Sequence, residues 1–481
     1  MDIKSLKDKI LQLAIQGKLV PQNENDEPAS VLLEKIKVKK EQLIKDKVIK
    51  KERTLSDISE DEKIFDLPKG WEWCRLGKAT ICRDGDRVPV SSKEREDRAK
   101  IYDYYGASGV IDKIDDYLFD KPLLLIGEDG ANLISRSTPI AFIAYGKYWV
   151  NNHAHVIDSL EFITLKYLEI YINAIDLKSF VTGTAQPKLN QANLNQIPIM
   201  LPPLEEQERI VAKVDELFEL IDELDSNKQE LLENIFNIKN KVLQLAIQGK
   251  LVEQCEDDEP ASVLLERIKA EKEQLIKDKV IKKEKPLPDI SEEEKLFKTP
   301  SSWEWCRLGN ISNIVMGQSP DSSTVSDVEG GIEFHQGKAS FGKVFINNSG
   351  LYCTKPSKIA IPDDILLSVR APVGTLNITD RELCIGRGLA AIRKYIDIEN
   401  KFFYYFIMAL EEELVKKSTG TTFKAVASTA IKEFLIPLPP LEEQKRIVEK
   451  IDLIMDYLDK LQQEIESQEI ILKDIIQKNN Q

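Results

Sequence analysis

Long apolar segments are missing from this sequence of 481 residues. The longest uninterrupted apolar stretch, at 402–410, is about half of the ~20 residues that a membrane-spanning helix needs. The opening MDIKSLKDK also lacks the basic-then-apolar order of a signal peptide. We therefore expect a cytoplasmic protein without a membrane segment.

Cysteine and histidine are scarce. The six cysteines never form a CxxC pair and are too few for a disulfide framework or a zinc ribbon, so we expect reduced thiols in the core. Of the three histidines only His153 and His155 lie together, and two imidazoles on one face of a strand occur in some metal sites. Because no third ligand is near them, contact with a base or ordinary packing is the favoured interpretation, and we expect no metal.

The motifs of nucleotide-dependent enzymes are absent as well. A P-loop needs GxxxxGK followed by Ser or Thr, and the nearest candidate, Gly337-Lys338-Ala339, fails at both ends. There is no GxGxxG after a strand and no Asn-Pro-Pro-aromatic loop of the adenine methyltransferase kind. Pro362-Asp363-Asp364 resembles the start of a nuclease motif, but no Glu-x-Lys follows, so a turn is favoured. We predict a chain without a catalytic site or a cofactor of its own.

An internal repeat organises the chain. The decapeptide LQLAIQGKLV stands at 11–20 and again at 243–252, and the segments 7–52 and 239–284 are identical at 38 of 46 positions. WEWCRLG recurs at 71 and 303, and LPPLEEQ at 201 and 438, whereas the segments between these blocks share little. The sequence therefore predicts five parts, namely an N-terminal helical segment 1–71, a domain 72–200, a central helical region 201–303, a second domain 304–437 and a C-terminal helix 438–481.

Apolar residues after each LPPL recur with the 4,3 spacing of a coiled coil. The first seam, interrupted at Lys228, consists of Ile210, Val214, Leu217, Ile221, Leu224, Leu231, Ile235, Ile238, Val242 and Leu245. The second consists of Ile447, Ile451, Ile454, Leu458, Leu461, Ile465, Leu472 and Ile475. The second copy lacks the LQLAIQGKLV ending, which stands at 11–20 instead, so we expect the N-terminal helix to complete it. The pattern predicts two long antiparallel helices with a pseudo-twofold relationship.

The two domains have a different texture. Short β-branched or aromatic runs begin at 122, 140, 358 and 389, with glycine-containing turns between them. Each domain is predicted to be a compact α/β (α+β) fold of about 130 residues, which is a usual size for one core.

The net charge of −14 argues against nucleic acid, because phosphate binding requires local positive charge. The domains, however, hold 15 basic and 17 acidic residues at 72–200 and 15 of each at 304–437, which sums to only −2. The helical segments carry the remaining −12. Near-neutral domains can present a basic face, although charged loop residues are more often ordinary solvated surface.

Loop residues of both domains are candidates for DNA binding. Glutamine pairs with adenine and Arg or Lys with guanine, while small hydroxyls beside exposed amides suit phosphates. The candidates in the first domain are Arg83, Arg87, Lys93, Tyr104, Tyr105, His153, His155, Thr182, Thr184 and Lys188. Those in the second are Gln318, Ser319, Gln336, Lys338, Arg370, Arg387, Thr419, Thr421 and Lys424.

Two unlike domains between repeated helices that carry LPPLEEQ, LQLAIQGKL and PASxLLE resemble, over the whole chain, the specificity subunit of a type I restriction-modification enzyme. YYGASGVID, LLIGEDGA, GKYWVNNHAHV and TGTAQPKLN in the first domain, with GQSP, SVRAPVGT and IGRG in the second, are similar to patches of target-recognition domains. The resemblance implies that each domain reads one half of a split double-stranded DNA sequence. It also implies helices that set the half-site spacing and dock two methyltransferase subunits, which motor-nuclease subunits then join.

The same resemblance implies a non-catalytic subunit, with S-adenosylmethionine, ATP and Mg²⁺ bound by its partners. Three alternatives remain open. The first is the recognition subunit of a methylation-only complex without a nuclease. The second is a self-contained nuclease or methyltransferase, which the missing cofactor loops oppose. The third is a purely structural coiled-coil adaptor, which would leave two elaborate and divergent domains unexplained.

Overall fold

The computed structural model describes residues 3–49, 54–63, 65–183, 186–396, 398–416 and 425–478, with side chains as far as Ser467. The chain forms two compact units, Met1–Lys228 with Gln468–Gln481, and Gln229–Ser467. Their boundary lies inside the long helix α8 (Leu204–Ile247). Each unit therefore contains one domain and its own share of the helical segments.

The first unit begins with helices, continues through a mixed domain and reaches the start of a long helix. Its helices are α1 (Ile3–Ile15), α2 (Ala29–Lys45), α3 (Leu76–Ala79), α4 (Ser92–Glu96), α5 (Asn132–Ser135), α6 (Phe162–Ala174), α7 (Gln191–Asn195) and the first part of α8, with short 3-10 turns at Glu60–Glu62, Asp84–Asp86 and Lys178–Phe180. Its strands are β1 (Glu72–Arg75), β2 (Ile81–Cys82), β3 (Tyr102–Gly106), β4 (Gly109–Ile114), β5 (Leu123–Gly127), β6 (Ala141–Ala144), β7 (Tyr148–Val150), β8 (Ala154–Asp158) and β9 (Pro198–Leu201).

The first domain is built on a four-stranded antiparallel sheet in the order β2-β8-β5-β6, accompanied by the three-stranded sheet β4-β3-β7. Successive side chains of a strand point to opposite faces. Leu124 and Ile126 of β5 accordingly share a cluster with Leu168 of α6, whereas Leu123 and Leu125 pack with residues of β7. Because both faces of β5 are covered, its sequence is continuously apolar rather than alternating.

The second unit repeats this plan with different strands. Its helices are the remainder of α8, α9 (Ala261–Lys277), α10 (Leu308–Ile311), α11 (Asn400–Ala409), α12 (Glu411–Lys416), α13 (Ser428–Lys432) and, as far as Ser467, α14 (Leu441–Lys478), with 3-10 turns at Glu292–Glu294, Ser322–Thr324 and Lys338–Ser340. Its strands are β10 (Glu304–Arg307), β11 (Ser312–Met316), β12 (Val325–Ser326), β13 (Ile332–His335), β14 (Tyr352–Cys353), β15 (Ile359–Ala360), β16 (Ile365–Ser368), β17 (Leu376–Ile378), β18 (Leu383–Ile385), β19 (Leu389–Lys394) and β20 (Leu435–Leu438).

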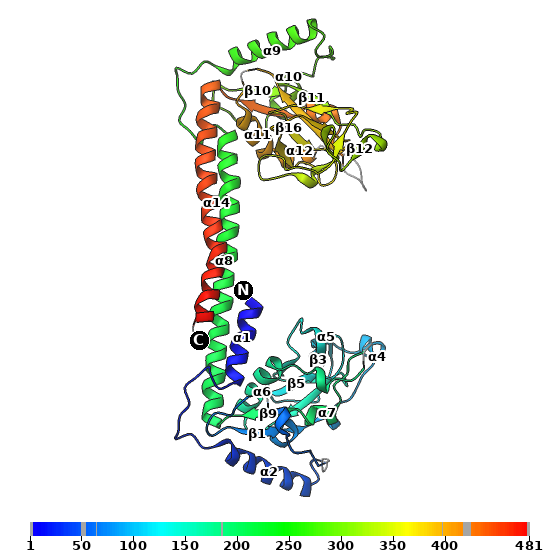
Figure 1. Ribbon diagram of the computed structural model, residues 1–481, viewed down its shortest axis with the longest axis vertical. Helices are drawn as coiled ribbons and strands as arrows, with labels where there is room; N and C mark the ends of the chain where they lie inside the picture. Colours follow the sequence, from blue (N-terminus) through cyan, green and yellow to red (C-terminus); the bar gives the residue numbers. More distant parts are fainter. Residues whose placement is uncertain are drawn as a thin grey trace. The chain divides into compact units, whose positions relative to one another are not determined.

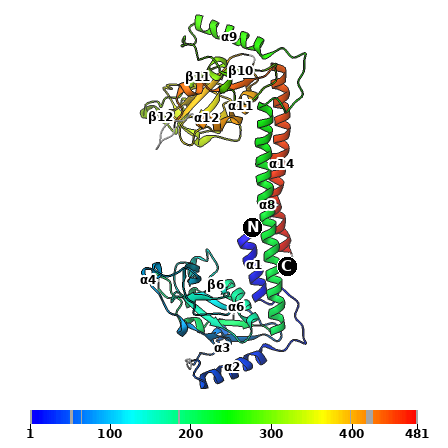
Figure 2. The same ribbon diagram turned by 180° about the vertical axis from the view of Figure 1, so that it is seen from behind.

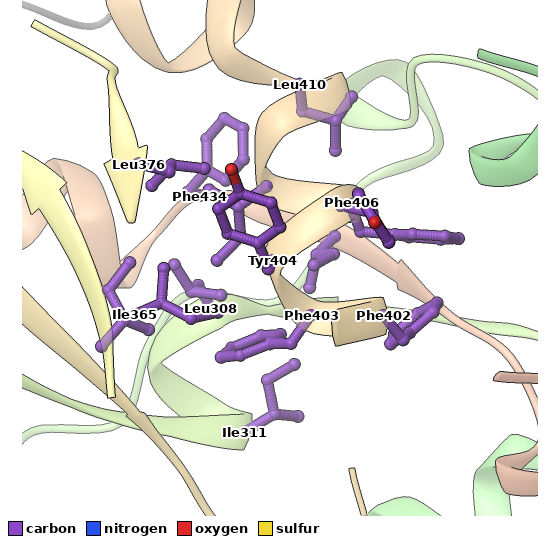
Figure 3. Packing of buried hydrophobic residues seen from close by; sticks show 14 of the residues in the cluster. Leu308, Ile311, Ile365, Leu376, Phe402, Phe403, Tyr404, Phe406, Leu410 and Phe434 are labelled. Atoms are coloured by element: carbon purple, nitrogen blue, oxygen red, sulfur yellow. The ribbon is translucent and has the colours of Figure 1, made fainter. Parts of the chain in front are cut away.

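Two sheets and one very apolar helix form the second domain. The sheets have the orders β11-β19-β16-β17 and β12-β14-β13-β18-β15. The apolar stretch at 402–410 forms most of α11, whose Phe402, Phe403 and Phe406 are fully buried. Figure 3 shows Phe403 beside Leu308 and Ile311 of α10, and these residues share one core with Ile365 of β16, so that α11 joins the sheet to α10. The predicted α/β class is confirmed for both domains.

A strand pair joins the two ends of each domain. β1 pairs antiparallel with β9, and β10 pairs in the same way with β20. The first strand of each pair carries the repeated WEWCRLG motif, and the second runs into LPPLEEQ. The repeated blocks therefore meet where each domain joins the helices.

The repeat extends to individual contacts within each unit. Lys7 lies 2.6 Å from Asp222, and its counterpart Lys239 lies 2.7 Å from Asp459. Higher in the chain, Gln22 contacts Glu206 and Gln254 contacts Glu443. In the first unit the partner of the later residue, Gln22, comes earlier in α8 than the partner of Lys7, so α1 runs antiparallel to α8. The second unit shows the same order, so the end of α8 runs antiparallel to α14. The views in Figures 1 and 2 agree on these two pairs.

The first predicted coiled-coil seam is only half correct. One row of the seam, Val214, Ile221, Ile235 and Val242, is buried, but Leu224, Leu231 and Ile238 of the other row are about half exposed or more. Near the start of α8 this other row is covered, since Ile210 belongs to a core that includes strand β9. Along the middle of α8 the same row is exposed at Leu224 and Leu231.

α1 is an integral part of the first unit. Its Ile10, Leu11, Ala14 and Ile15 are buried in the core shared with α6 and α8, and Gln12 donates a hydrogen bond to the Ala174 carbonyl at the end of α6. The expected contacts of this helix with Leu472 and Ile475 lie outside the described side chains. Completion of the C-terminal helix by α1 therefore stays a prediction.

Candidate nucleic-acid interface

The loops at one end of the first domain's sheet are connected through the buried residue His155. Its Nδ1 lies 2.6 Å from Oδ2 of Asp84, and its Nε2 lies 2.7 Å from the Leu189 carbonyl oxygen. A carbonyl can only accept, so Nε2 donates to Leu189, and Nδ1 faces the Asp84 carboxylate. His155 thus ties the 83–87 loop to the 186–190 segment.

Two further cations complete this network. Arg87 donates to Glu128 at 2.8 Å and to the Ala154 carbonyl at 2.6 Å, and Lys188 lies 3.1 Å from Glu128. Burial raises the pKa of the Asp84 carboxyl, but the hydrogen bond from His155 and the charges of His155 and Arg87 outweigh burial and lower this pKa below its usual value. The loops are therefore held by paired charges.

The carboxylates of Asp84 and Glu128 and the imidazole of His155 come close enough together to suggest a cation site, with ligand atoms within 4.8 Å of one another. The donor set does not fit a metal. Both imidazole nitrogens are engaged, and Arg87 and Lys188 already neutralise the carboxylates. The cluster functions as a structural ion network.

The remaining candidates of the first domain differ in accessibility. Tyr104 is fully buried, and its hydroxyl both donates to and accepts from the backbone of Val90. Arg83 pairs with Asp86 and Asp158. Tyr104 and His155 thus have no free polar atom for a base, and their location indicates a role in holding the loops. Burial also raises the pKa of the half-buried Tyr105.

Three other residues of the first domain present groups to solvent. Lys93 is exposed on α4. His153 is half exposed, with Nδ1 held 2.7 Å from Asp129, which leaves Nε2 as its outward-facing atom. Thr182 is exposed and donates to the Lys188 carbonyl at 3.2 Å. Thr184 lies outside the described residues.

The second domain brings five of its candidates together in three loops, namely Gln318, Ser319, Gln336, Lys338 and Arg387. We call the segments 317–319, 336–338 and 386–388 the loop cluster. Ser319 donates to Oε1 of Gln336 at 2.9 Å, and the backbone N–H of Arg387 points at Ser319 Oγ from 3.5 Å. Gln318, Gln336 and Arg387 are exposed. Their amide and guanidinium donors have no hydrogen-bond partner in the part of the chain that the structure describes.

Backbone hydrogen bonds lock the loop cluster. Gln318 donates to Ile385 at 3.0 Å, Gly386 to His335 at 2.8 Å and Gly388 to Gln336 at 3.2 Å. The approach is too close for side chains, because a Cβ on Gly317 would lie 2.2 Å from the Gly386 oxygen, and one on Gly386 would lie 2.5 Å from the Gln336 amide oxygen. The glycines therefore bring the three loops into direct backbone contact.

Lys338 lies at the end of one segment of the loop cluster, and Arg370 flanks the cluster. Lys338 donates a hydrogen bond to the Thr375 hydroxyl at 3.2 Å. The backbone N–H of Val369 donates to the Gly388 carbonyl, which places the next residue, the exposed Arg370, beside the cluster. Thr419, Thr421 and Lys424 lie outside the described residues. The sequence did not identify Asp84 and Glu128 as the partners of the basic loop residues, since contacts across 41 to 71 positions leave no local pattern.

Each domain also contains a buried charged group that the sequence did not reveal. In the second domain Nε2 of His335 donates to the Glu333 carboxylate at 2.7 Å, and Arg381 pairs with the same carboxylate. Burial lowers the pKa of His335. This pair lies directly before Gln336, and it fixes the strand end from which the loop cluster projects.

No helix of the described residues is long and apolar enough to cross a bilayer.

Comparison with known proteins identifies the two domains. A family model described as the type I restriction modification DNA specificity domain matches residues 68–234 and 300–472. The EcoAI specificity subunit of Escherichia coli is 30% identical over 95% of this chain and 90% of its own length. The EcoEI specificity subunit, also of E. coli, is 36% identical over 67% of this chain and 64% of its own length.

A solved structure agrees with the sequence relatives. It is described as the basis of complex assembly and conformational transition of the type I R-M system, is 27% identical and has a TM-score of 0.54. The similarity covers 85% of this chain and 96% of that chain.

Proposed function

Because this chain belongs to the family of type I restriction-modification DNA specificity proteins, we propose that it is the subunit that selects the DNA sequence of such an enzyme. The observation that carries this proposal is the double match of the family model, once over each domain. A protein with two separate and dissimilar recognition domains suits a DNA target with two different halves. Each domain reads one half.

The described side chains support a binding role rather than catalysis. The loop cluster offers donors of the kind that read base edges in the major groove. The only cluster of potential metal ligands found among the described residues is neutralised by Arg87 and Lys188. The chemistry of methylation and cleavage therefore belongs to partner subunits, and the chain itself is non-catalytic.

The partners in this proposal are two methyltransferase subunits and the motor-nuclease subunits. The two units present equivalent helical surfaces, since the same contacts recur at Lys7 and Asp222 and at Lys239 and Asp459. The helical segments hold a net charge of −12, which is unfavourable on DNA and suitable for docking a protein. S-adenosylmethionine, ATP and Mg²⁺ act in those partners, and the assembly works in the cytoplasm.

Native mass spectrometry of the assembly, purified through a tag on this chain, tests the stoichiometry. We expect two methyltransferase subunits for each copy of the chain. One methyltransferase per chain would contradict the equivalence of the two units.

Mapping of methylated adenines in the source genome, with and without this gene, tests the function. A two-part methylated sequence should disappear when the gene is removed. The same methylation in both strains would refute the proposal. If methylation depends on the gene but cleavage of foreign DNA does not, the chain belongs to a methylation-only complex. Isolated chain that methylates or cuts DNA by itself would instead identify it as an enzyme.

A further inference from the structure

The loop cluster contains two exposed side-chain donors, Arg387 and Gln336. Unlike Arg387, two other arginines of this domain are paired with carboxylates. Arg381 pairs with Glu333, and Arg393 pairs with Asp364. Arg387 has no acidic partner among the described residues, although it is flanked by two glycines that fix its loop. A guanidinium held on a rigid loop without an internal partner is free for an external acceptor.

Gln336 is the second donor, and its orientation is set by Ser319. The serine hydroxyl donates to Oε1 of Gln336 at 2.9 Å. The Arg387 backbone N–H faces the same hydroxyl oxygen at 3.5 Å, which favours the serine proton pointing at the glutamine. Ser319 therefore occupies one lone pair of Oε1, and the second lone pair of Oε1 and the Nε2 hydrogens stay available to an external partner.

From these contacts we propose that Arg387 and Gln336 determine base specificity in the second domain, with Ser319 as the residue that positions Gln336. Arg387 reads a guanine through O6 and N7. Gln336 reads an adenine by donating from Nε2 to N7 and accepting the N6 hydrogen at Oε1. This inference rests on the proposed function, and it specifies a G·C pair and an A·T pair in the half-site of this domain.

Charge alone would give a different result from base reading. A phosphate group can bind a lysine as well as an arginine. Guanine, in contrast, is matched by the two parallel N–H donors of a planar guanidinium, which a lysine does not have. Arg387→Lys thus separates the two roles without changing charge. Gln336→Glu removes the Nε2 donors, and Ser319→Ala removes only the group that orients the amide.

The test uses the assembly purified through a tag on the full-length chain and a pool of random DNA duplexes, with the bound DNA sequenced. Arg387→Lys should lose about tenfold or more of the preference for one G·C pair. Gln336→Glu should lose the preference for one A·T pair, and Ser319→Ala should weaken the preference at that same pair only. Lys355→Ala, which removes an exposed charge outside the loop cluster, is the matched control and should leave every preference intact.

The outcomes are distinguishable. Loss of preference at single pairs of one half-site, with the other half unchanged, supports the inference. Variants that keep the parental sequence and only bind more weakly would show phosphate contacts and overturn it. A parent assembly that selects no sequence would refute the proposed function itself. Equal melting temperatures of the parent and the variants verify that none of these effects comes from unfolding.

Discussion

The indole N–H of Trp303 donates a hydrogen bond to Oε2 of Glu443 at 2.8 Å, inside the core of the second unit. Glu443 is 1% exposed and is the second glutamate of the LPPLEEQ motif. The first unit has the same contact between Trp71 and Glu206 at 2.9 Å. The two repeated motifs are therefore joined by a buried hydrogen bond wherever a domain meets the helices.

Trp303→Phe should destabilise the second unit in a pH-dependent manner. Burial raises the pKa of Glu443, and the Trp303 hydrogen bond partly opposes this rise. Without the indole the pKa rises further, so the variant loses stability relative to the parent as the pH rises past the parent's folded pKa, which lies above the unfolded value of 4.5. The deficit relative to the parent should grow from pH 4 to pH 8, reaching about 1.5 to 3 kcal/mol.

Melting temperatures of variant and parent across this pH range measure the effect. Trp305→Phe in the same motif is the control, because Trp305 packs on Phe297 without a hydrogen bond to a carboxylate. A constant deficit for Trp303→Phe at every pH would contradict the assigned role of the carboxylate.

Asp84→Asn should destabilise the first domain, again in a pH-dependent manner. The lowered pKa of Asp84 means that its contribution is present above the unfolded value near 3.8 and is lost as the pH falls through the folded value. Breaking a buried charge network of this type costs roughly 3 to 5 kcal/mol. We expect a large deficit at pH 7 that shrinks below about pH 4.

Unfolding curves at several pH values are the appropriate measurement. Asp86→Asn provides the comparison, since the Asp86 side chain is 48% exposed and pairs with Arg83 at the surface. It should cost less than about 1 kcal/mol. Equal effects of the two substitutions would mean that the His155 network contributes little to stability.

Leu11→Ala should destabilise the first unit by about 2 to 5 kcal/mol, because Leu11 lies in the core that α1 shares with α6 and α8. Deletion of residues 1–20 should be more severe and should impair subunit assembly. Thermal unfolding and co-purification of partners measure both effects. Lys18→Ala, at an exposed position, is expected to behave as the parent, and a deletion variant with normal stability and partner binding would refute the role of α1.

A seven-residue helical insertion after Lys228 tests whether α8 sets the half-site spacing. At ~1.5 Å per residue the insertion lengthens the helix by about 10 Å, or roughly three base pairs of ~3.4 Å. Local rearrangement absorbs part of this length, so we expect the spacing in the methylated sequence to change by about one to three base pairs. The half-site sequences should stay the same. Full methylation at the original spacing would show that α8 is not the ruler.

Much of the fold could be predicted because its signals are local or repeated. The runs beginning at 122 and 389 became β5 and β19, and the seam row through Val214 and Val242 is buried as expected. Leu224 and Leu231 were predicted to be buried as well, but a heptad pattern does not reveal how wide the neighbouring surface is. The predicted seam therefore included residues of one row that are exposed.

The candidate interface was harder to predict, because its contacts join distant positions. Basic residues such as Arg87 were visible in the sequence, but Glu128, which pairs with Arg87, lies 41 positions away, directly after β5. The loop cluster depends on Gly317 and Gly386, whose close approach arises only when β11, β13 and β18 bring their ends together. Residue type indicated which groups could bind DNA, and only the tertiary structure distinguished free donors from paired ones.

Exchange of residues 304–437 for the second domain of another family member, followed by genome-wide mapping of methylated adenines, tests the central claim most directly. If each domain reads its own half-site, the methylated sequence should change in one half and keep the other half. A change in both halves, or in neither, would contradict independent recognition by the two domains.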